Sequence, residues 1–121
     1  MSKRYDKSNP RLTELIRLLK KTSSENEVQI WRDIAIRLEK SSNNYAEVNV
    51  SKINRYAKDG ETLLVPGKVL GSGLLECRVT VAALNFSEAA EDKIAGKQGE
   101  CLSIEQLLAQ NPKGSHVRIL R

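Results

Sequence analysis

The chain of 121 residues has few aromatic residues, two cysteines and one histidine, and each shortage excludes a kind of site. Its aromatic side chains are Trp31, Phe86 and three tyrosines, too few to predict an aromatic platform for stacking RNA bases. Cys77 and Cys101 lack the Cys-x-x-Cys spacing of a zinc site, and one histidine adds too few ligands. We therefore expect no bound metal and two reduced, buried cytosolic thiols.

Long apolar runs are also missing. No segment approaches the roughly 20 apolar residues that a membrane-spanning helix needs. The first residues are polar and charged, with no apolar run behind them, so they do not resemble a secretory signal peptide. We expect a cytoplasmic protein without a membrane partner.

The sequence offers no recognisable catalytic constellation. His116 is the only histidine, and no serine or cysteine is identifiable as its partner. We interpret it as a hydrogen-bonded turn residue or an RNA contact. The carboxylates are typical of helix surfaces, where they pair with Lys and Arg. The sequence therefore predicts no enzyme, no catalytic residue, no cofactor and no small-molecule substrate.

Positive charge is concentrated at one end of the chain. The formal net charge is +5, and residues 22–60 and 61–121 each carry equal numbers of acidic and basic side chains. The excess therefore lies within residues 1–21, which hold Asp6, Glu14 and seven basic residues. A basic arm on a neutral body indicates a polyanionic partner, although a solvated basic face is an alternative. The seven basic residues are Lys3, Arg4, Lys7, Arg11, Arg17, Lys20 and Lys21.

A glycine-rich segment, Val65–Leu75, contains three glycines, Pro66 and Lys68 between apolar stretches. Backbone at glycine can approach a ligand closely, so this segment could bind phosphate. Val69 stands where a Walker A loop needs Ser or Thr, and Glu76 stands where the dinucleotide fingerprint needs glycine. A nucleotide-dependent enzyme is therefore disfavoured. Two uses stay open: an RNA backbone site, or a strand-to-strand loop whose glycines serve turn geometry.

Local patterns predict the elements. Residues 1–8 are polar and predict an extended arm. Asn9 and Pro10 are typical of a helix start, and an apolar stripe continues through Leu19 until Thr22–Ser24 ends the helix. A second helix is expected over 26–40, with an inward face of Val28, Trp31, Ile34, Ala35 and Leu38.

The second half of the chain alternates strands and helices. We expect strands at 48–50, 62–65, 79–84, 101–102 and 117–120, because these segments are apolar and rich in β-formers. Short helices should begin after the caps Ser51, Ser87 and Ser103, with Gln106 completing a capping box. The helix after Ser51 should turn Ile53, Tyr56 and Ala57 inward, and Gly96 should follow the one after Ser87. This alternation predicts an α/β or mixed α+β fold.

Four segments in register resemble the archaeal and eukaryotic large-subunit ribosomal protein family called eighteen-e, related to bacterial large-subunit protein fifteen. The segments are residues 9–16, the stretch 46–56 beginning Ala-Glu-Val-Asn-Val, the glycine segment 65–75, and residues 111–118. The resemblance covers about residues 9–121, and the short chain looks like the archaeal form. It implies a helical basic N-terminal arm on a small domain of irregular β-β-α turns. We expect the division 1–44 and 45–121 within a single structural unit.

The resemblance implies a structural constituent of the large ribosomal subunit. Its partners would be ribosomal RNA and neighbouring ribosomal proteins. If strands 62–65 and 117–120 are neighbours, the two glycine turns could share one surface. A protein-interaction adaptor, docking through helix 12–20, is the alternative. The candidate RNA-binding residues are the seven basic residues of 1–21, together with Lys68, Gly71, Ser72, Gly73, Lys113, Ser115, His116 and Arg118, of which Lys68 and Arg118 would anchor the globular body.

Overall fold

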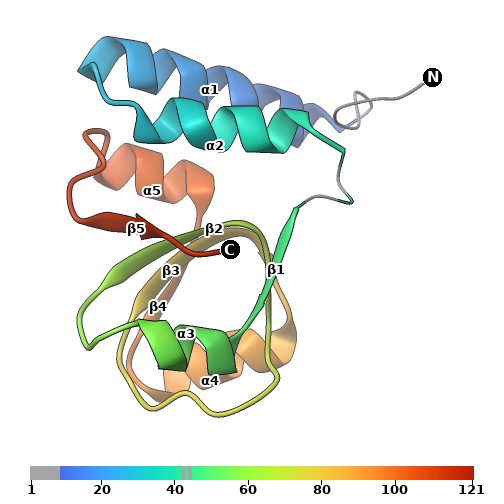
Figure 1. The fold of residues 1–121 in the computed structure, drawn as a ribbon, viewed down its shortest axis with the longest axis vertical. Helices are drawn as coiled ribbons and strands as arrows, with labels where there is room; N and C mark the ends of the chain where they lie inside the picture. The colour runs from blue at the N-terminus through green and yellow to red at the C-terminus, as the bar shows by residue number, and fades with distance from the viewer. Residues whose placement is uncertain (1–8, 42, 44) are drawn as a thin grey trace. The chain divides into compact units, whose positions relative to one another are not determined.

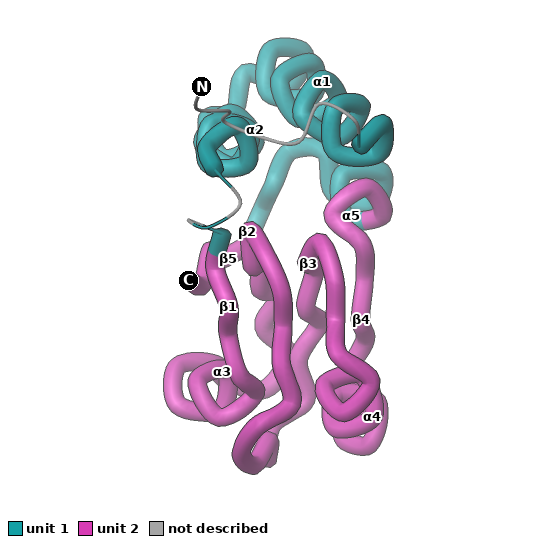
Figure 2. The backbone as a smooth tube through the Cα atoms, turned by 90° about the vertical axis from the view of Figure 1, so that its right-hand side faces the viewer, with its two compact units in different colours: residues 1–45, 107–115 teal, residues 46–106, 116–121 magenta. Residues whose placement is uncertain are grey.

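A computed structural model describes residues 9–41, 43 and 45–121 (Figure 1). The expected arm of residues 1–8, with the candidates Lys3, Arg4 and Lys7, lies outside the described residues. The chain forms two compact units, one of residues 1–45 and 107–115 and one of residues 46–106 and 116–121 (Figure 2). We call them unit 1 and unit 2. The domain division at residues 44 and 45 stays a prediction.

Unit 1 is built on two helices, α1 (Pro10–Asn26) and α2 (Ile30–Glu39), which pack against each other. The expected start of α1 is confirmed, because Asn9 Oδ1 accepts a hydrogen bond from the Leu12 N–H at 3.2 Å and Pro10 stands in the first turn. The facing apolar side chains are buried, including Trp31 in α2. These helices thus bury their apolar stripes inside unit 1.

The predicted boundary between these helices is wrong. Thr22–Ser24 continue α1, which ends at Asn26, and α2 begins only at Ile30. Glu27 adopts a left-handed φ of 56° and its N–H donates to the Ser23 carbonyl, which closes the helix. The Ser23 hydroxyl donates to the Val28 carbonyl, so a serine expected to end the helix instead ties down the following turn. Val28 lies in that turn and is half-buried.

Unit 2 contains a parallel sheet of five strands: β1 (Ala46–Asn49), β2 (Thr62–Leu70), β3 (Thr80–Phe86), β4 (Glu100–Ser103) and β5 (Val117–Ile119). One edge of β2 pairs with β3, so its other edge is shared by β5, along Thr62–Leu64, and β1, along Gly67–Leu70. Together with the helices, this sheet confirms the predicted mixed α/β class. It also confirms that strands 62–65 and 117–120 are neighbours.

The glycine segment is mostly strand, which corrects its assignment as a loop over Val65–Leu75. β2 runs on through Leu70, and its register against β3 shifts by one residue between Val65 and Lys68. Such a bulge accommodates Pro66, which has no N–H for the ladder. A Cβ on Gly67 would lie 2.0 Å from the Ala46 carbonyl oxygen of β1. Glycine is therefore required there for strand pairing.

Two helices, α3 (Val50–Tyr56) and α4 (Glu88–Gly96), cover one face of the sheet in unit 2 (Figures 1 and 2). Ile53 of α3 and Ile94 of α4 belong to the same buried cluster as strand residues such as Val65 and Val81. Ser87 caps α4 as expected, because its hydroxyl accepts from the Ala90 N–H at 3.2 Å. This cluster is the core of unit 2.

The predicted start of α3 is wrong in detail. Val50 is its first residue and Asn49 precedes it, so Ser51 lies inside the helix rather than at its cap. Ile53 is buried as expected, but Tyr56 is 45% exposed, with the Arg55 guanidinium 5.8 Å from its ring centroid. Ala57 is half-buried.

Helix α5 (Ile104–Gln110) follows β4 and begins at the predicted capping box. The Ser103 N–H donates to Gln106 Oε1 at 2.8 Å, and the Gln106 N–H donates to Ser103 Oγ at 3.0 Å. The helix belongs to unit 2 through Gln106 and to unit 1 from Leu107 onward. No described helix is long and apolar enough to cross a membrane.

Candidate nucleic-acid interface

Helix α1 separates apolar and basic side chains onto different faces. Its buried residues are Leu12, Leu15, Ile16, Leu19 and Ser23. The four basic candidates on the helix are all exposed: Arg11, Arg17, Lys20 and Lys21. The 3.6-residue period thus places the described part of the N-terminal charge at the surface of unit 1.

Carboxylates neutralise part of this basic face. Arg17 forms an ion pair with Glu14, and Lys20 Nζ lies 2.5 Å from Glu39 Oε2 of α2. The hydrogen bond from Arg17, helped by the charges of Arg17 and Lys21, holds the pKa of Glu14 below its usual value. Because solvent screens exposed ion pairs, they contribute little to stability. A phosphate could replace either carboxylate at small cost.

Lys68 is exposed on β2, not in a loop. In the strand register it stands between Glu47 of β1 and Asn85 of β3. The next residue, Val69, belongs to the core under α3 and α4. Because neighbouring strand residues point to opposite faces, Lys68 lies on the other face of the sheet.

Gly71, Ser72 and Gly73, here called the Gly71–Gly73 loop, follow the end of β2 and make hydrogen bonds within the protein. The Ser72 N–H donates to Asn49 Oδ1 at 3.1 Å, and the Ser72 carbonyl accepts from the Ser51 N–H at 3.2 Å. Lys93 Nζ donates to the carbonyls of Gly71 and Gly73 at 2.6 and 2.7 Å. The loop is therefore a fixed feature of the fold.

The glycines of this loop have a packing role. A Cβ on Gly71 would lie 2.5 Å from the Ala89 Cβ of α4. Gly73 has a φ of +97°, and its Cβ would lie 2.3 Å from the Ser51 Cβ of α3. Close approach to two helices accounts for both glycines without a ligand.

The candidate turn at 111–115 lies in unit 1 and is fastened by side chains. Asn111 Nδ2 donates to the Ser115 carbonyl at 2.8 Å, and the Ser115 N–H donates to Asn111 Oδ1 at 3.2 Å. Trp31 Nε1 donates to the Pro112 carbonyl at 2.7 Å. Lys113 and Ser115 are both exposed on this turn. It can therefore present a cation and a hydroxyl from a fixed backbone.

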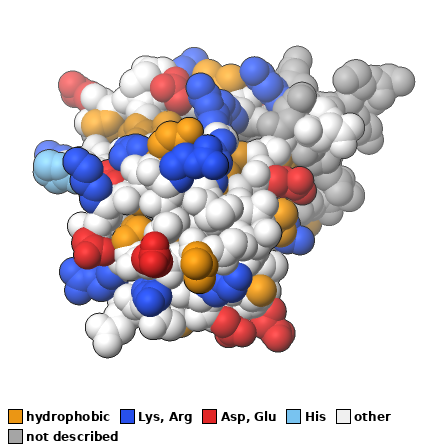
Figure 3. Space-filling view, turned by 60° about the horizontal axis from the view of Figure 1, so that its bottom comes forward, with side chains coloured by type: hydrophobic (Ala, Val, Ile, Leu, Met, Phe, Trp, Pro, Cys, Tyr) orange, Lys and Arg blue, Asp and Glu red, His pale blue; other side chains and the backbone are white. Residues whose placement is uncertain are grey.

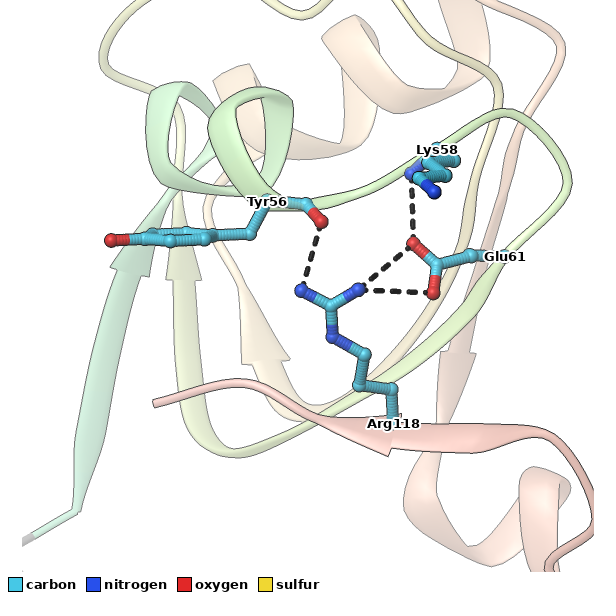
Figure 4. Close-up of polar contacts among 4 residues, drawn as sticks. All are labelled: Tyr56, Lys58, Glu61 and Arg118. Carbon is cyan, nitrogen blue, oxygen red and sulfur yellow. Dashed lines mark hydrogen bonds and ion pairs between the residues drawn. The ribbon is translucent and has the colours of Figure 1, made fainter.

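Arg118 of β5 is engaged inside unit 2 (Figure 4). Its guanidinium donates to the Tyr56 carbonyl at 2.8 Å and to Glu61 Oε2 at 3.1 Å. The Lys58 backbone N–H and then Arg118 hold the pKa of Glu61 below its usual value. Arg118 thus joins β5 to the end of α3, and an RNA contact through it would have to break or share these bonds.

Within unit 2, His116 and the Gly71–Gly73 loop lie at opposite ends of β2, and the idea that the two glycine turns share one surface stays a prediction for the rest of the turn. His116, exposed with a φ of 61°, precedes β5, which pairs with the beginning of β2 at Thr62. The Gly71–Gly73 loop follows the other end of β2, after Leu70. Eight strand steps of about 3.3 Å separate these ends, roughly 25 Å.

Charges of both signs are interspersed on the face seen in Figure 3. The described residues contain no group of three or more His, Cys, Asp or Glu side chains placed to hold a metal ion. Cys77 and Cys101 are half-buried rather than fully buried. Burial raises the pKa of the Cys101 thiol to about 11 and also raises that of Cys77, which makes both poor nucleophiles.

Two features of the surface were missed by sequence reasoning. Lys93 was not a candidate, because its contacts are about 20 residues away in the chain. On α2, a shallow hollow of about 220 Å³ is lined by Asp33, Ile36, Arg37 and Lys40. Arg37 Nε is buried there without a hydrogen-bond partner among the described residues. The basic residues of α2 are balanced by acidic ones in the sequence, so the charge distribution did not indicate them as candidates.

The family described as ribosomal protein 60S L18 and 50S L18e matches residues 1–121. The chain is 74% identical to the large ribosomal subunit protein eL18 of Methanospirillum hungatei and 65% identical to that of Methanoregula boonei, in both cases over all of both chains. It is 52% identical to that of Methanococcus maripaludis over 98% of each chain.

These similarities define a structural, non-enzymatic protein of the large ribosomal subunit, which acts in translation on the cytoplasmic ribosome. The chain belongs to the L18 and L18e family of ribosomal proteins. The family resemblance inferred from the sequence is thereby confirmed.

Proposed function

We propose that this ribosomal protein binds large-subunit ribosomal RNA mainly through the basic side chains of residues 3–21. The observation that carries the proposal is the basic face of α1, where exposed Arg17, Lys20 and Lys21 lie on the side of the helix away from its buried apolar stripe. The helix is thus held by its apolar side while its charge faces outward. Phosphate neutralisation by such side chains lets RNA helices approach one another.

Further contacts would come from Lys68, the Gly71–Gly73 loop, and the turn with Lys113, Ser115 and His116. Lys68 and Lys113 are cationic, Ser72 and Ser115 carry hydroxyl groups, and aromatic side chains are few, so these segments suit the phosphate and shape of folded RNA rather than its bases. Arg118 is a weaker candidate, because its guanidinium already serves β5 and α3. Neighbouring ribosomal proteins would complete the surroundings.

The alternative of an adaptor that docks through the apolar stripe of helix 12–20 is disfavoured. Docking needs an exposed apolar stripe, but Leu15 and Leu19 are 0% exposed and Leu12 is 7% exposed. The stripe is already covered within unit 1, where α1 packs against α2. The surface that α1 leaves open is charged, which favours an RNA partner over a hydrophobic one.

Salt-dependent binding of the full chain to large-subunit ribosomal RNA tests the proposal. We expect the triple variant Lys3→Ala, Arg4→Ala, Lys7→Ala to bind more weakly. Its log–log salt slope should be shallower by roughly 0.7 to 0.9 for each phosphate that is no longer neutralised. The thermal midpoint should not change. The matched control replaces three exposed basic residues of unit 2, Lys58, Arg78 and Lys97, with alanine. Equal slopes for the two triple variants would remove the N-terminal segment from the mechanism.

A further inference from the structure

We propose that Lys93 of α4 is the cation of a separate phosphate-binding site at the Gly71–Gly73 loop. This inference rests on the proposed RNA-binding function and adds a residue to it. The ligand would be one phosphate of the ribosomal RNA backbone. The site lies wholly in unit 2, apart from the basic face of α1.

The hydrogen bonds of Lys93 place its charge at the loop. Lys93 Nζ donates to the Gly71 carbonyl at 2.6 Å and to the Gly73 carbonyl at 2.7 Å. An ammonium group has three N–H donors. Two of them serve these carbonyls, and the residue is exposed, so the third can be donated to an anion in solution.

The loop around this ammonium is already in one conformation. The Ser72 N–H donates to Asn49 Oδ1 and the Ser72 carbonyl accepts from the Ser51 N–H, so the Ser72 backbone is fixed. Its side chain is exposed. The loop passes between α3 and α4 (Figure 2), where Gly73 abuts Ser51 and Gly71 abuts Ala89. A phosphate could therefore meet the Lys93 ammonium and the Ser72 hydroxyl with little ordering cost.

Lys68, the lysine nearest in sequence, is poorly placed for this site. Its side chain lies on the face of the sheet opposite the core under α3 and α4, whereas the loop packs on those helices. At the Gly71–Gly73 loop the cation is therefore Lys93, and Lys68 would contact RNA separately.

The acidic residues of α4 do not block the site. Glu88, Glu91 and Asp92 all precede Lys93 on the same helix. At 100° per residue they project between 100° and 160° away from Lys93 around the helix axis, on other sides of α4. Ala89, four residues before Lys93, shares its side and abuts the loop. The ammonium therefore meets the loop on the side of α4 that these carboxylates leave clear.

Three variants of the full chain test the proposal by affinity for large-subunit ribosomal RNA over a range of salt. We expect Lys93→Met to bind about tenfold more weakly, with a salt slope shallower by about 1. Lys93→Arg, which keeps the charge and the donors, should keep the affinity and the salt slope of the natural chain. Lys97→Met removes the same charge one turn further on without touching the loop, and should change affinity by less than about threefold.

A fourth variant separates phosphate binding from loop support. Lys93→Gln keeps an N–H donor that can face the loop, although its side chain is one bond shorter, and it carries no charge. Amide NMR spectra would report whether the loop is intact. With an intact loop, the proposal expects weak binding, whereas normal binding would make Lys93 a loop support only and overturn the proposal.

The experiment distinguishes refutation of the Lys93 site from refutation of RNA binding by the protein. If the natural chain binds the RNA and Lys93→Met matches Lys97→Met, the Lys93 site is refuted and the proposed function stands. If the natural chain does not bind the RNA in a salt-dependent way, both are refuted.

Discussion

Two regions were predicted to meet phosphate, the basic helix α1 and the glycine segment 65–75, and they differ in what their residues do. On α1 the charged side chains are exposed and the apolar ones buried. In the glycine segment the glycines lie against the backbone of β1, Ala89 of α4 and Ser51 of α3. The comparison teaches that charged side chains on an exposed helix face stay available to a partner, whereas a glycine can be required by packing within the fold.

The largest effect on stability should come from substituting Gly67. If Gly67 has no packing role, the contrast between the glycine segment and α1 does not hold. A Cβ there would lie 2.0 Å from the Ala46 carbonyl oxygen, so strands β1 and β2 would have to separate. We expect Gly67→Ala to lower the free energy of unfolding by about 3 kcal/mol, measured by urea denaturation.

Gly96→Ala is the control for this substitution, since a Cβ on Gly96 meets nothing within 4 Å. It should leave the free energy of unfolding unchanged or raise it by up to about 1 kcal/mol. If the two variants have similar stability, the pairing of residues 46–49 with 67–70 is not the reason for the glycine.

An intermediate effect on stability is expected at Arg118. Unlike the basic side chains of α1, Arg118 makes hydrogen bonds that stabilise the fold of unit 2. Arg118→Met leaves the Tyr56 carbonyl and Glu61 without their charged donor, which should cost about 1 kcal/mol near neutral pH. The pKa of Glu61 lies below its ordinary value of 4.5, so its contribution is present above that value and lost as pH falls through the lower, folded pKa.

The difference between the natural chain and Arg118→Met should therefore shrink on acidification to about pH 3. Parallel urea titrations at the two pH values measure it. A difference that is the same at both would mean that the Tyr56 contact, and not the charge of Glu61, accounts for the stabilisation.

The features that could be predicted were those that depend on neighbours in sequence. Asn9, Ser87 and the Ser103–Gln106 box cap their helices through partners three residues away, so a short pattern reveals them. The apolar stripe of α1 and its basic face both follow from the 3.6-residue period of the helix. The same locality explains why the mixed α/β class and the exposure of the basic residues of α1 could be predicted from the sequence.

The features that could not be predicted depend on distant partners. β2 extends through Pro66 and Gly67 because β1, some 20 residues earlier, pairs along its second half. Arg118 finds Glu61 at a separation of 57 residues, and Lys93 finds the Gly71 carbonyl at 22. Nothing in the local sequence distinguishes cations with such distant hydrogen-bond partners from other exposed cations.

The smallest effect on stability is expected on α1, and it tests the other half of the comparison. Lys21 is exposed, and exposed Lys20 pairs with the half-buried carboxylate of Glu39. The double variant Lys20→Ala, Lys21→Ala should lower the free energy of unfolding by less than about 1 kcal/mol. Its affinity for ribosomal RNA should nevertheless fall, with a salt slope shallower by about one to two if both residues contact phosphate. A variant that loses stability but keeps its salt slope would show that these lysines, like Arg118, belong to the fold, and the contrast between α1 and the glycine segment would no longer hold.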